Sequence, residues 1–187
     1  MSVVTRKILR WAASIFPVLY MFMSRKFMII FLVVIVGCFL FLEIVRFRLP
    51  GINDWLFRHI KILKHKEKAE MSSITFFLIS ALLTIIFFRK DIAIAAMFFT
   101  TFGDSVSTLV GMKYGRTRIG HRSLEGSLAF LTVCVIISLL LTFIIDLRLR
   151  VLILGSIVGT VIELIPMPID DNFTVPILCG FAMTLIV

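Results

Sequence analysis

The chain has 187 residues, of which 60% are hydrophobic and 17% are charged, and its mean hydropathy is +1.09. A soluble domain carries roughly 45–50% apolar and about 25% charged residues, so the composition excludes an ordinary soluble domain and indicates a multi-pass integral membrane protein. The net charge of +9 fits the positive-inside bias and contact with anionic lipid headgroups. We expect no nucleic-acid binding, because the sequence contains no soluble basic module.

Seven apolar segments follow one another along the chain. We expect each to be helical, because an open sheet cannot satisfy its backbone groups in lipid. The first two are joined only by Ser24, Arg25 and Lys26, which predicts a tight helical hairpin or a re-entrant unit. The fourth has the broken character of a discontinuous helix. We therefore predict one all-α integral membrane domain, residues 1–187, with about seven transmembrane helices, some short or broken, at 8–23, 27–42, 74–88, 92–112, 127–145, 150–165 and 174–187.

The basic residues predict the orientation of the chain in the membrane. If the N-terminus and residues 43–73, 113–126 and 166–173 lie on one side, that side holds 14 of the 20 Lys and Arg residues and should be cytoplasmic. Residues 43–73 are predicted to be a basic cytoplasmic loop, in which Lys61 to Lys68 contacts anionic headgroups. Nine of the eleven acidic residues lie on or near the same side. The positive-inside rule does not predict that clustering, so it indicates a functional site.

The first motif surrounds Asp104, which lies within or at the end of an apolar helix. A charge at such a position is costly, and it usually faces a polar cavity and has a partner. Gly103, Ser107 and Gly111 recur every four residues, which lets another helix or a ligand approach closely. A face that only packs helices, with Asp104 paired to an arginine, is the alternative, but packing alone does not require a carboxylate.

The second motif is the loop from Lys113 to Ser127, in which cations, glycines and hydroxyls precede the next helix. Backbone N–H groups at a helix start, with Arg and Lys nearby, can bind phosphate. A cytoplasmic loop that only obeys the positive-inside rule is the alternative. The candidate phosphate-binding residues are Lys113, Arg116, Arg122, Ser123 and Gly126, with Glu125 in a supporting role.

The third motif runs from Glu163 to Pro176 and contains Asp170, Asp171 and Asn172 in succession. Capping of a helix start explains one of these acids, and Pro176 suits a first helical turn. Capping does not explain all three together. Carboxylate and amide oxygens are hard ligands, suited to a magnesium ion that holds substrate phosphates. We therefore favour metal or nucleotide binding at this motif.

An acidic metal-binding set and a basic phosphate-binding set on one membrane face are what phosphoryl transfer needs, because its catalysis is largely positioning and charge neutralisation. The motifs together resemble the CTP-dependent lipid kinases (dolichol kinase, phytol kinase and CTP-dependent diacylglycerol kinase), which are related to the phosphatidate cytidylyltransferases. The resemblance covers residues 43–187 and rests on Gly103-Asp104 with Gly111, Lys113, Gly115 and Arg116; on Arg122-Ser123-x-Glu125-Gly126-Ser127; on Glu163 with Asp170-Asp171-Asn172-Phe173-Thr174-Val175-Pro176; and on Glu43-Ile44-Val45-Arg46 before a basic loop leading to Glu70 and Thr75.

The sequence departs from that family pattern in one position and lacks the hallmark of its relatives. Arg122 stands where the family often has Lys, which keeps the cation. The Gly-His-Gly-Gly run of the cytidylyltransferases is absent. The absence of that run favours the kinase branch.

The resemblance implies that the γ-phosphate of CTP passes, with Mg²⁺, to the hydroxyl of a membrane lipid, either diacylglycerol or an isoprenoid alcohol such as phytol or a polyprenol. Asp104 would be catalytic, as a magnesium ligand or by orienting the hydroxyl. Asp170 and Asp171 would bind metal, Asn172 would bind nucleotide, and Glu43, Arg46 and Glu163 would support them. The active-site segments would be 103–127 and 163–176. A cytidylyltransferase that makes a CDP-lipid is one alternative, and a small transporter with Asp104 and Glu163 along an ion path is another.

Overall fold

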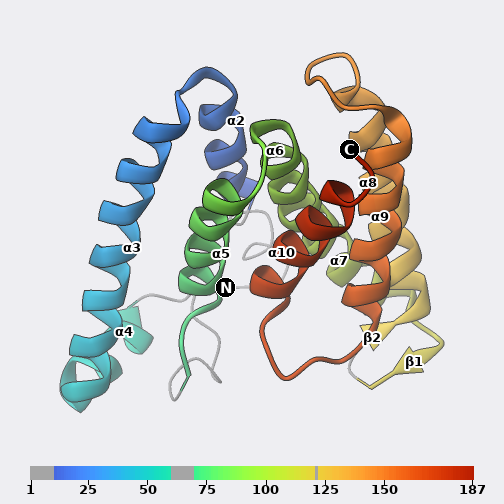
Figure 1. Ribbon diagram of the computed structural model, residues 1–187. Coiled ribbons are helices and arrows are strands. Elements are labelled where there is room, and N and C mark those ends of the chain that lie inside the picture. Colours follow the sequence, from blue (N-terminus) through green and yellow to red (C-terminus); the bar gives the residue numbers. More distant parts are fainter. Residues whose placement is uncertain (1–10, 60–69, 121) are drawn as a thin grey trace.

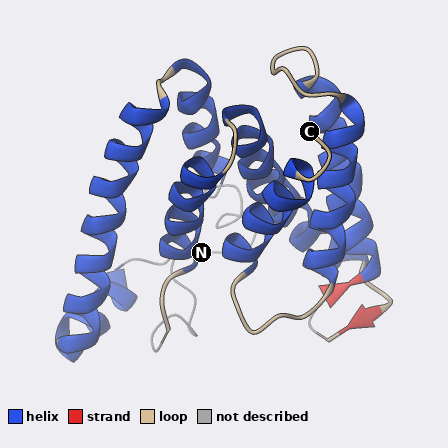
Figure 2. Ribbon diagram, viewed as in Figure 1, coloured by secondary structure: helices blue, strands red, loops and turns tan. Residues whose placement is uncertain are grey.

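The computed structural model describes residues 11–59, 70–120 and 122–187. This part of the chain is helical apart from its connections and one short antiparallel hairpin (Figures 1 and 2). The elements, in chain order, are η1 (Trp11–Ser14), α2 (Ile15–Phe22), α3 (Arg25–Arg48), α4 (Pro50–His59), α5 (Ser73–Phe87), α6 (Lys90–Phe98), the π-helical turn η3 (Phe99–Gly103), α7 (Asp104–Tyr114), β1 (Arg118–Ile119), β2 (Arg122–Ser123), α8 (Leu124–Leu141), α9 (Leu149–Leu164) and α10 (Asp171–Thr184).

The described part of each of the seven apolar segments is largely helical, which confirms the all-helical prediction for those residues. Within the described residues, three helices are long and apolar enough to cross a membrane: α3, the continuous helix Lys90–Tyr114 formed by α6, η3 and α7, and α8. Helix α9 has 16 residues and reaches about 24 Å, short of the roughly 30 Å of a hydrocarbon core. The fold thus fits a membrane protein but does not support a count of seven transmembrane helices, and the number of crossings stays a prediction.

The path of the chain differs from the expectation in three places. The fourth segment is not broken, because η3 joins α6 and α7 into one helix. Residues 43–48 end α3 and residues 50–59 form α4, so the first part of the predicted 43–73 loop is helical, while Lys61 to Lys68 lies outside the described residues. A short turn does join α2 to α3, but α2 packs against α6 and α3 packs against α5. The predicted tight hairpin is therefore a turn between two helices that pack on different neighbours.

Helix α6 forms the centre of the bundle. Residues Ile92 to Met97 are almost completely buried, as expected for a helix that is apolar on every side. Helices α2, α5, α8 and α10 surround it. Outside this centre, α3, α5, α10, α9, α8 and α7 follow one another, each packed against the next, and α3 lies at the outer edge (Figure 1).

The helices alternate in direction, so their connections gather at two ends (Figure 1). The turns at 23–24, 88–89 and 142–148 lie at one end. The end of α3, the start of α5, the β1–β2 hairpin and the 165–170 connection lie at the other, which we call the polar end. The buried charged residues of the described chain are Glu43, Arg46, Asp104 and Glu163. They lie near the ends of α3 and α9 and on α7, which runs toward the polar end; that this end faces the cytoplasm stays a prediction.

Candidate active site

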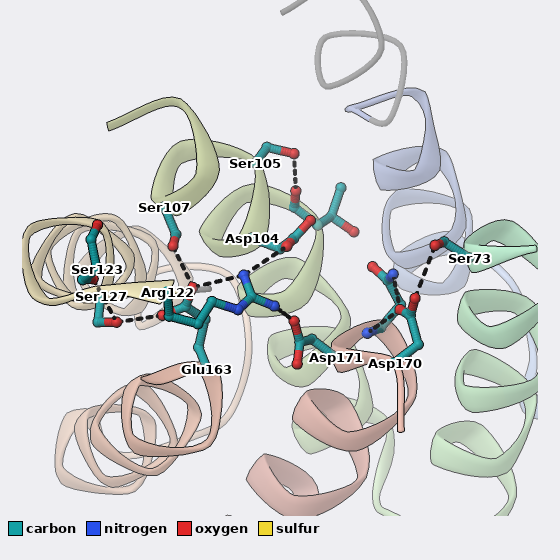
Figure 3. Close-up of polar contacts among 12 residues, drawn as sticks. Ser73, Asp104, Ser105, Ser107, Arg122, Ser123, Ser127, Glu163, Asp170 and Asp171 are labelled. Atoms are coloured by element: carbon teal, nitrogen blue, oxygen red, sulfur yellow. Dashed lines mark hydrogen bonds and ion pairs between the residues drawn. The ribbon is translucent and has the colours of Figure 1, made fainter. Parts of the chain in front are cut away.

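Arg122 lies at the centre of a charged cluster near the polar end (Figure 3). Its guanidinium forms ion pairs with Glu163 of α9, at 3.1 Å, and with Asp171 of α10, and it lies 4.0 Å from the Asp104 carboxylate of α7. The Arg122 side chain is 15% exposed and that of Glu163 only 1%. Because water is largely excluded, these charges interact mainly with one another. We call these four residues the Arg122 cluster.

The β1–β2 hairpin delivers Arg122 to this position. Arg122 pairs with Ile119 across the hairpin, and Gly120 takes a left-handed backbone conformation with a φ of 60°, which glycine adopts without steric cost. Helix α8 starts directly after β2, and Ser123 is its N-cap, accepting a hydrogen bond from the Gly126 amide at 3.1 Å. A tight turn followed at once by a capped helix therefore fixes the place of the guanidinium.

Glu163 connects the cluster to three helices. Its two carboxylate oxygens accept hydrogen bonds from the hydroxyls of Ser107 on α7 and Ser127 on α8, each at 2.5 Å, besides the bond from Arg122. Helices α7 and α8 approach closely here: a Cβ atom at Gly126 would lie 2.8 Å from the Ser107 carbonyl oxygen. The close helix contact predicted for the small-residue face is thus present, and it places two hydroxyls beside a buried carboxylate. Glu163 in turn holds Arg122.

Asp104 follows directly after the π-helical turn η3. Just before it, Gly103 allows the Phe130 ring to pack on the backbone, since an added Cβ would lie 2.5 Å from that ring. The hydroxyls of Thr101 and Ser105 donate to carbonyls of their own helix, four residues earlier, while the Asp104 carboxylate points to Arg122 (Figure 3). π-Helical turns inside α-helices are frequent at functional sites, so the position of Asp104 directly after η3 agrees with a place in a functional site.

Asp170 and Asp171 point to different partners (Figure 3). Asp170 is the N-cap of α10: it accepts from the Asn172 amide at 3.0 Å, from the Asn172 side chain, and from the Ser73 hydroxyl of α5 at 2.9 Å. Asp171 pairs with Arg122. The helix-capping alternative therefore accounts for Asp170 and Asn172 in this conformation, and Asp171 is the one of the three placed in the Arg122 cluster.

Glu43 and Arg46 form a second buried cluster, between α3 and α5. They make the ion pair expected from their spacing. Glu43 also accepts from the Ser72 amide at 2.8 Å and the Thr75 hydroxyl at 3.1 Å, and Arg46 donates to the Glu70 carbonyl at 2.7 Å. The start of α5 also contacts the start of α10 beside the Arg122 cluster, because Ser73, the residue after Ser72, donates to Asp170. Glu43 and Arg46 thus form a buried cluster of their own beside the start of α5, and the supporting role expected of them stays a prediction.

The predicted phosphate-binding set divides into two groups. Lys113 and Arg116 are exposed at the polar end. Ser123 and Gly126, in contrast, are bonded to each other at the start of α8. The Leu124 amide donates to the Thr117 carbonyl at 2.9 Å, and Glu125 accepts from the Thr117 amide at 3.0 Å. Two amides at this helix start are thus already used within the chain, so Arg122 and the exposed cations are the better placed phosphate ligands.

The carboxylates of the cluster suit a magnesium ion in kind. Asp104 and Asp171 offer hard oxygen ligands, and within the Arg122 cluster three carboxylates accompany one guanidinium. In this conformation they converge on the guanidinium, and no three His, Cys, Asp or Glu side chains of the described residues are grouped to hold a metal ion.

Comparison with known proteins gives one match over most of the chain and two over about half of it. The chain is 29% identical over 180 residues to an uncharacterized protein of Rickettsia prowazekii, covering 92% of this chain and 88% of that protein. It is 26% identical over 99 residues to CTP-dependent diacylglycerol kinase 1 of Saccharomyces cerevisiae, covering 51% of this chain and 34% of the enzyme. It is 30% identical over 102 residues to the enzyme of the same name from Eremothecium gossypii, covering 52% of this chain and 32% of the enzyme.

The chain thus spans about a third of the length of these two kinases. No family model matches it, and no solved structure matches it. The partial matches suggest the CTP-dependent diacylglycerol kinase family and support, at most, a lipid kinase.

Proposed function

We propose that the protein is a CTP-dependent lipid kinase, which transfers the γ-phosphate of CTP to the hydroxyl of a membrane lipid at the cytoplasmic face. The observation that carries the proposal is the Arg122 cluster, in which Asp104, Glu163 and Asp171 converge on one guanidinium. Arginine and carboxylates are the side chains that phosphoryl transfer uses for phosphate oxygens and magnesium. The partial matches to CTP-dependent diacylglycerol kinases support CTP as the donor.

Arg122 would bind the phosphates by exchanging partners. Its guanidinium lies on carboxylates in this conformation, and phosphate oxygens can take the same bidentate hydrogen bonds. Glu163, with its two serine donors, would keep the guanidinium at the site during that exchange. The exposed Lys113 and Arg116 would attract the polyphosphate electrostatically.

Asp104 and Asp171 would hold Mg²⁺, which neutralises phosphate charge in reactions of this kind. The acceptor hydroxyl would lie beside Asp104. The γ-phosphoryl group would pass from CTP to the hydroxyl oxygen, the hydroxyl proton would be taken up by the Asp104 carboxylate, and CDP would leave. Asp170 would act through the position of the α10 start, which it caps, and Asn172 would hold Asp170 in place by donating to it.

Two other functions compete with this proposal. A cytidylyltransferase could use the same residue types but would join CMP to phosphatidic acid and release pyrophosphate. A transporter would need polar residues through the whole membrane depth. The buried charges of the described chain lie on α7 and near the polar ends of α3 and α9, which favours a site at one face.

The test is incubation of the purified protein with Mg²⁺, γ-labelled CTP and a panel of lipid alcohols, followed by thin-layer chromatography. Label in one lipid supports the kinase and identifies the acceptor. A parallel reaction with α-labelled CTP and phosphatidic acid that yields CDP-lipid, without any labelled lipid in the first, would replace the proposal by a cytidylyltransferase.

A matched pair of variants tests the assignment of Asp104. Asp91 and Asp104 lie on the same continuous helix, at its start and past its middle, and Asp91 pairs with Arg89 away from the cluster. Asp104→Asn should abolish phosphate transfer without unfolding the protein, whereas Asp91→Asn should retain it. Wild-type turnover by Asp104→Asn would remove Asp104 from the mechanism.

A further inference from the structure

In the part of helix α4 whose side chains are described, up to Trp55, apolar side chains turn outward and polar side chains turn inward. Ile52 is 40% exposed and Trp55 57% exposed, and their spacing of three residues places them on one helical face. Asn53 and Asp54, in contrast, are partly buried. A helix on the surface of a soluble protein shows the opposite pattern, with its apolar stripe toward the core. The outward face of α4 is therefore built for surroundings other than water.

The position of α4 indicates what those surroundings are. It follows α3, a helix long and apolar enough to cross a membrane, after the single residue Leu49, and it packs against α3. Figure 1 places α4 at the polar end of α3, at the outer edge of the molecule. The last turns of α3 expose Ile44 and Phe47, and Leu49 is also exposed. The apolar face of α4 thus continues the apolar surface of a helix that lipid would cover.

We propose that α4 is an interfacial anchor, whose Ile52 and Trp55 side chains insert into the surface of an anionic lipid bilayer at the level of the headgroups. Tryptophan prefers this level, because its ring is apolar while its N–H needs a hydrogen-bond acceptor. Amphipathic helices lie in the interface plane in this way. Anionic lipid is favoured because the exposed Arg48 precedes α4 and the sequence then carries Arg58, Lys61, Lys64, Lys66 and Lys68.

The chain offers a direct experiment, since it contains two tryptophans, Trp11 and Trp55. The variant Trp11→Phe keeps an aromatic ring against Phe102, which Trp11 contacts at a centroid distance of 5.8 Å, and leaves Trp55 as the only tryptophan. The full chain is reconstituted into vesicles of phosphatidylcholine and phosphatidylglycerol whose acyl chains carry bromine near the headgroup or near the bilayer centre. We expect blue-shifted Trp55 emission that shallow bromine quenches more strongly than deep bromine.

Each other outcome counts against the proposal. Emission as in water, open to an aqueous quencher and insensitive to bromine, would place Trp55 in solvent. Blue-shifted emission without bromine quenching would place it against protein, such as a second copy of the chain. Equal quenching in vesicles of phosphatidylcholine alone would overturn the preference for anionic lipid. None of these results depends on whether the protein is a kinase.

Discussion

Replacement of Glu163 by glutamine tests whether one buried carboxylate organises the site. Glu163 is 1% exposed and accepts three hydrogen bonds, two from serines and one from Arg122. Glutamine has nearly the same shape but offers one acceptor oxygen, and its amide would face donors. In Glu163→Gln, at least one donor would therefore lose its acceptor, and Arg122 would lose one of its carboxylate partners.

The size of the effect follows from those contacts. Breaking a buried ion pair costs about 3–5 kcal/mol when the remaining charge is left without a partner. Arg122 keeps Asp171 and lies near Asp104, so the loss should be nearer to that of a hydrogen bond to a charged group, about 1.5–3 kcal/mol. For a chain of this size that corresponds to a fall in melting temperature of about 3–12 °C.

The assay is thermal unfolding of the detergent-solubilised protein, combined with the phosphate-transfer reaction. Transfer should fall at least about tenfold. A displaced Arg122 needs to lose only about 1.4 kcal/mol of transition-state stabilisation to slow the reaction by that factor. Ser138→Ala is the control: it removes a buried hydroxyl contact to Ser156, at 3.0 Å, away from the cluster, and should leave transfer unchanged. A Glu163→Gln protein with wild-type melting temperature and wild-type transfer would refute the role given to Glu163.

Three further predictions use differential scanning fluorimetry and the same transfer assay. Gly126→Ala should destabilise the fold by about 1–3 kcal/mol, because the added Cβ would lie 2.8 Å from the Ser107 carbonyl oxygen. The control Gly37→Ala, whose added Cβ would meet nothing within 4 Å, should be neutral or stabilising. Equal melting temperatures for the two variants would contradict the close α7–α8 contact. Glu43→Gln should lower the melting temperature, since Glu43 ties α3 to the start of α5, and should reduce transfer less than Glu163→Gln does; the reverse order would place Glu43 in the site. Arg122→Gln should abolish transfer while Arg118→Gln, an exposed cation of the same hairpin, should retain it, and loss in both would point to general charge attraction.

Local physics made part of the site predictable from the sequence. A carboxylate in an apolar helix is costly enough to require a partner, and Asp104 does lie near Arg122. The spacing of Glu43 and Arg46 predicted their ion pair, and the small residues before and after Ser107 predicted close helix packing. Each of these inferences depends either on residues within one or two helical turns or on the large free-energy cost of a charge in an apolar helix.

The remaining contacts join residues that are far apart in the chain. Ser73 and Asp170 are separated by 97 residues, and Ser107 and Glu163 by 56; a serine in an apolar helix carries no pattern that indicates which carboxylate it will meet. The sequence places Asp170 and Asp171 next to each other, which predicts that they bind one metal ion together. Adjacent residues at a helix start, however, point in different directions. At the start of α8, the Leu124 amide bonds to the Thr117 carbonyl across the hairpin, which the sequence does not indicate, whereas the bond of the Gly126 amide to Ser123 is an ordinary N-cap contact within the helix.

The measurement that tests the account most directly is transfer of label from γ-labelled CTP to a lipid alcohol by the wild-type protein, with Asp104→Asn and Asp91→Asn in parallel. The account predicts one labelled phospholipid with the wild type and Asp91→Asn, and none with Asp104→Asn. Absence of labelled lipid from every acceptor with a folded wild-type protein, or equal labelling by all three proteins, would contradict it.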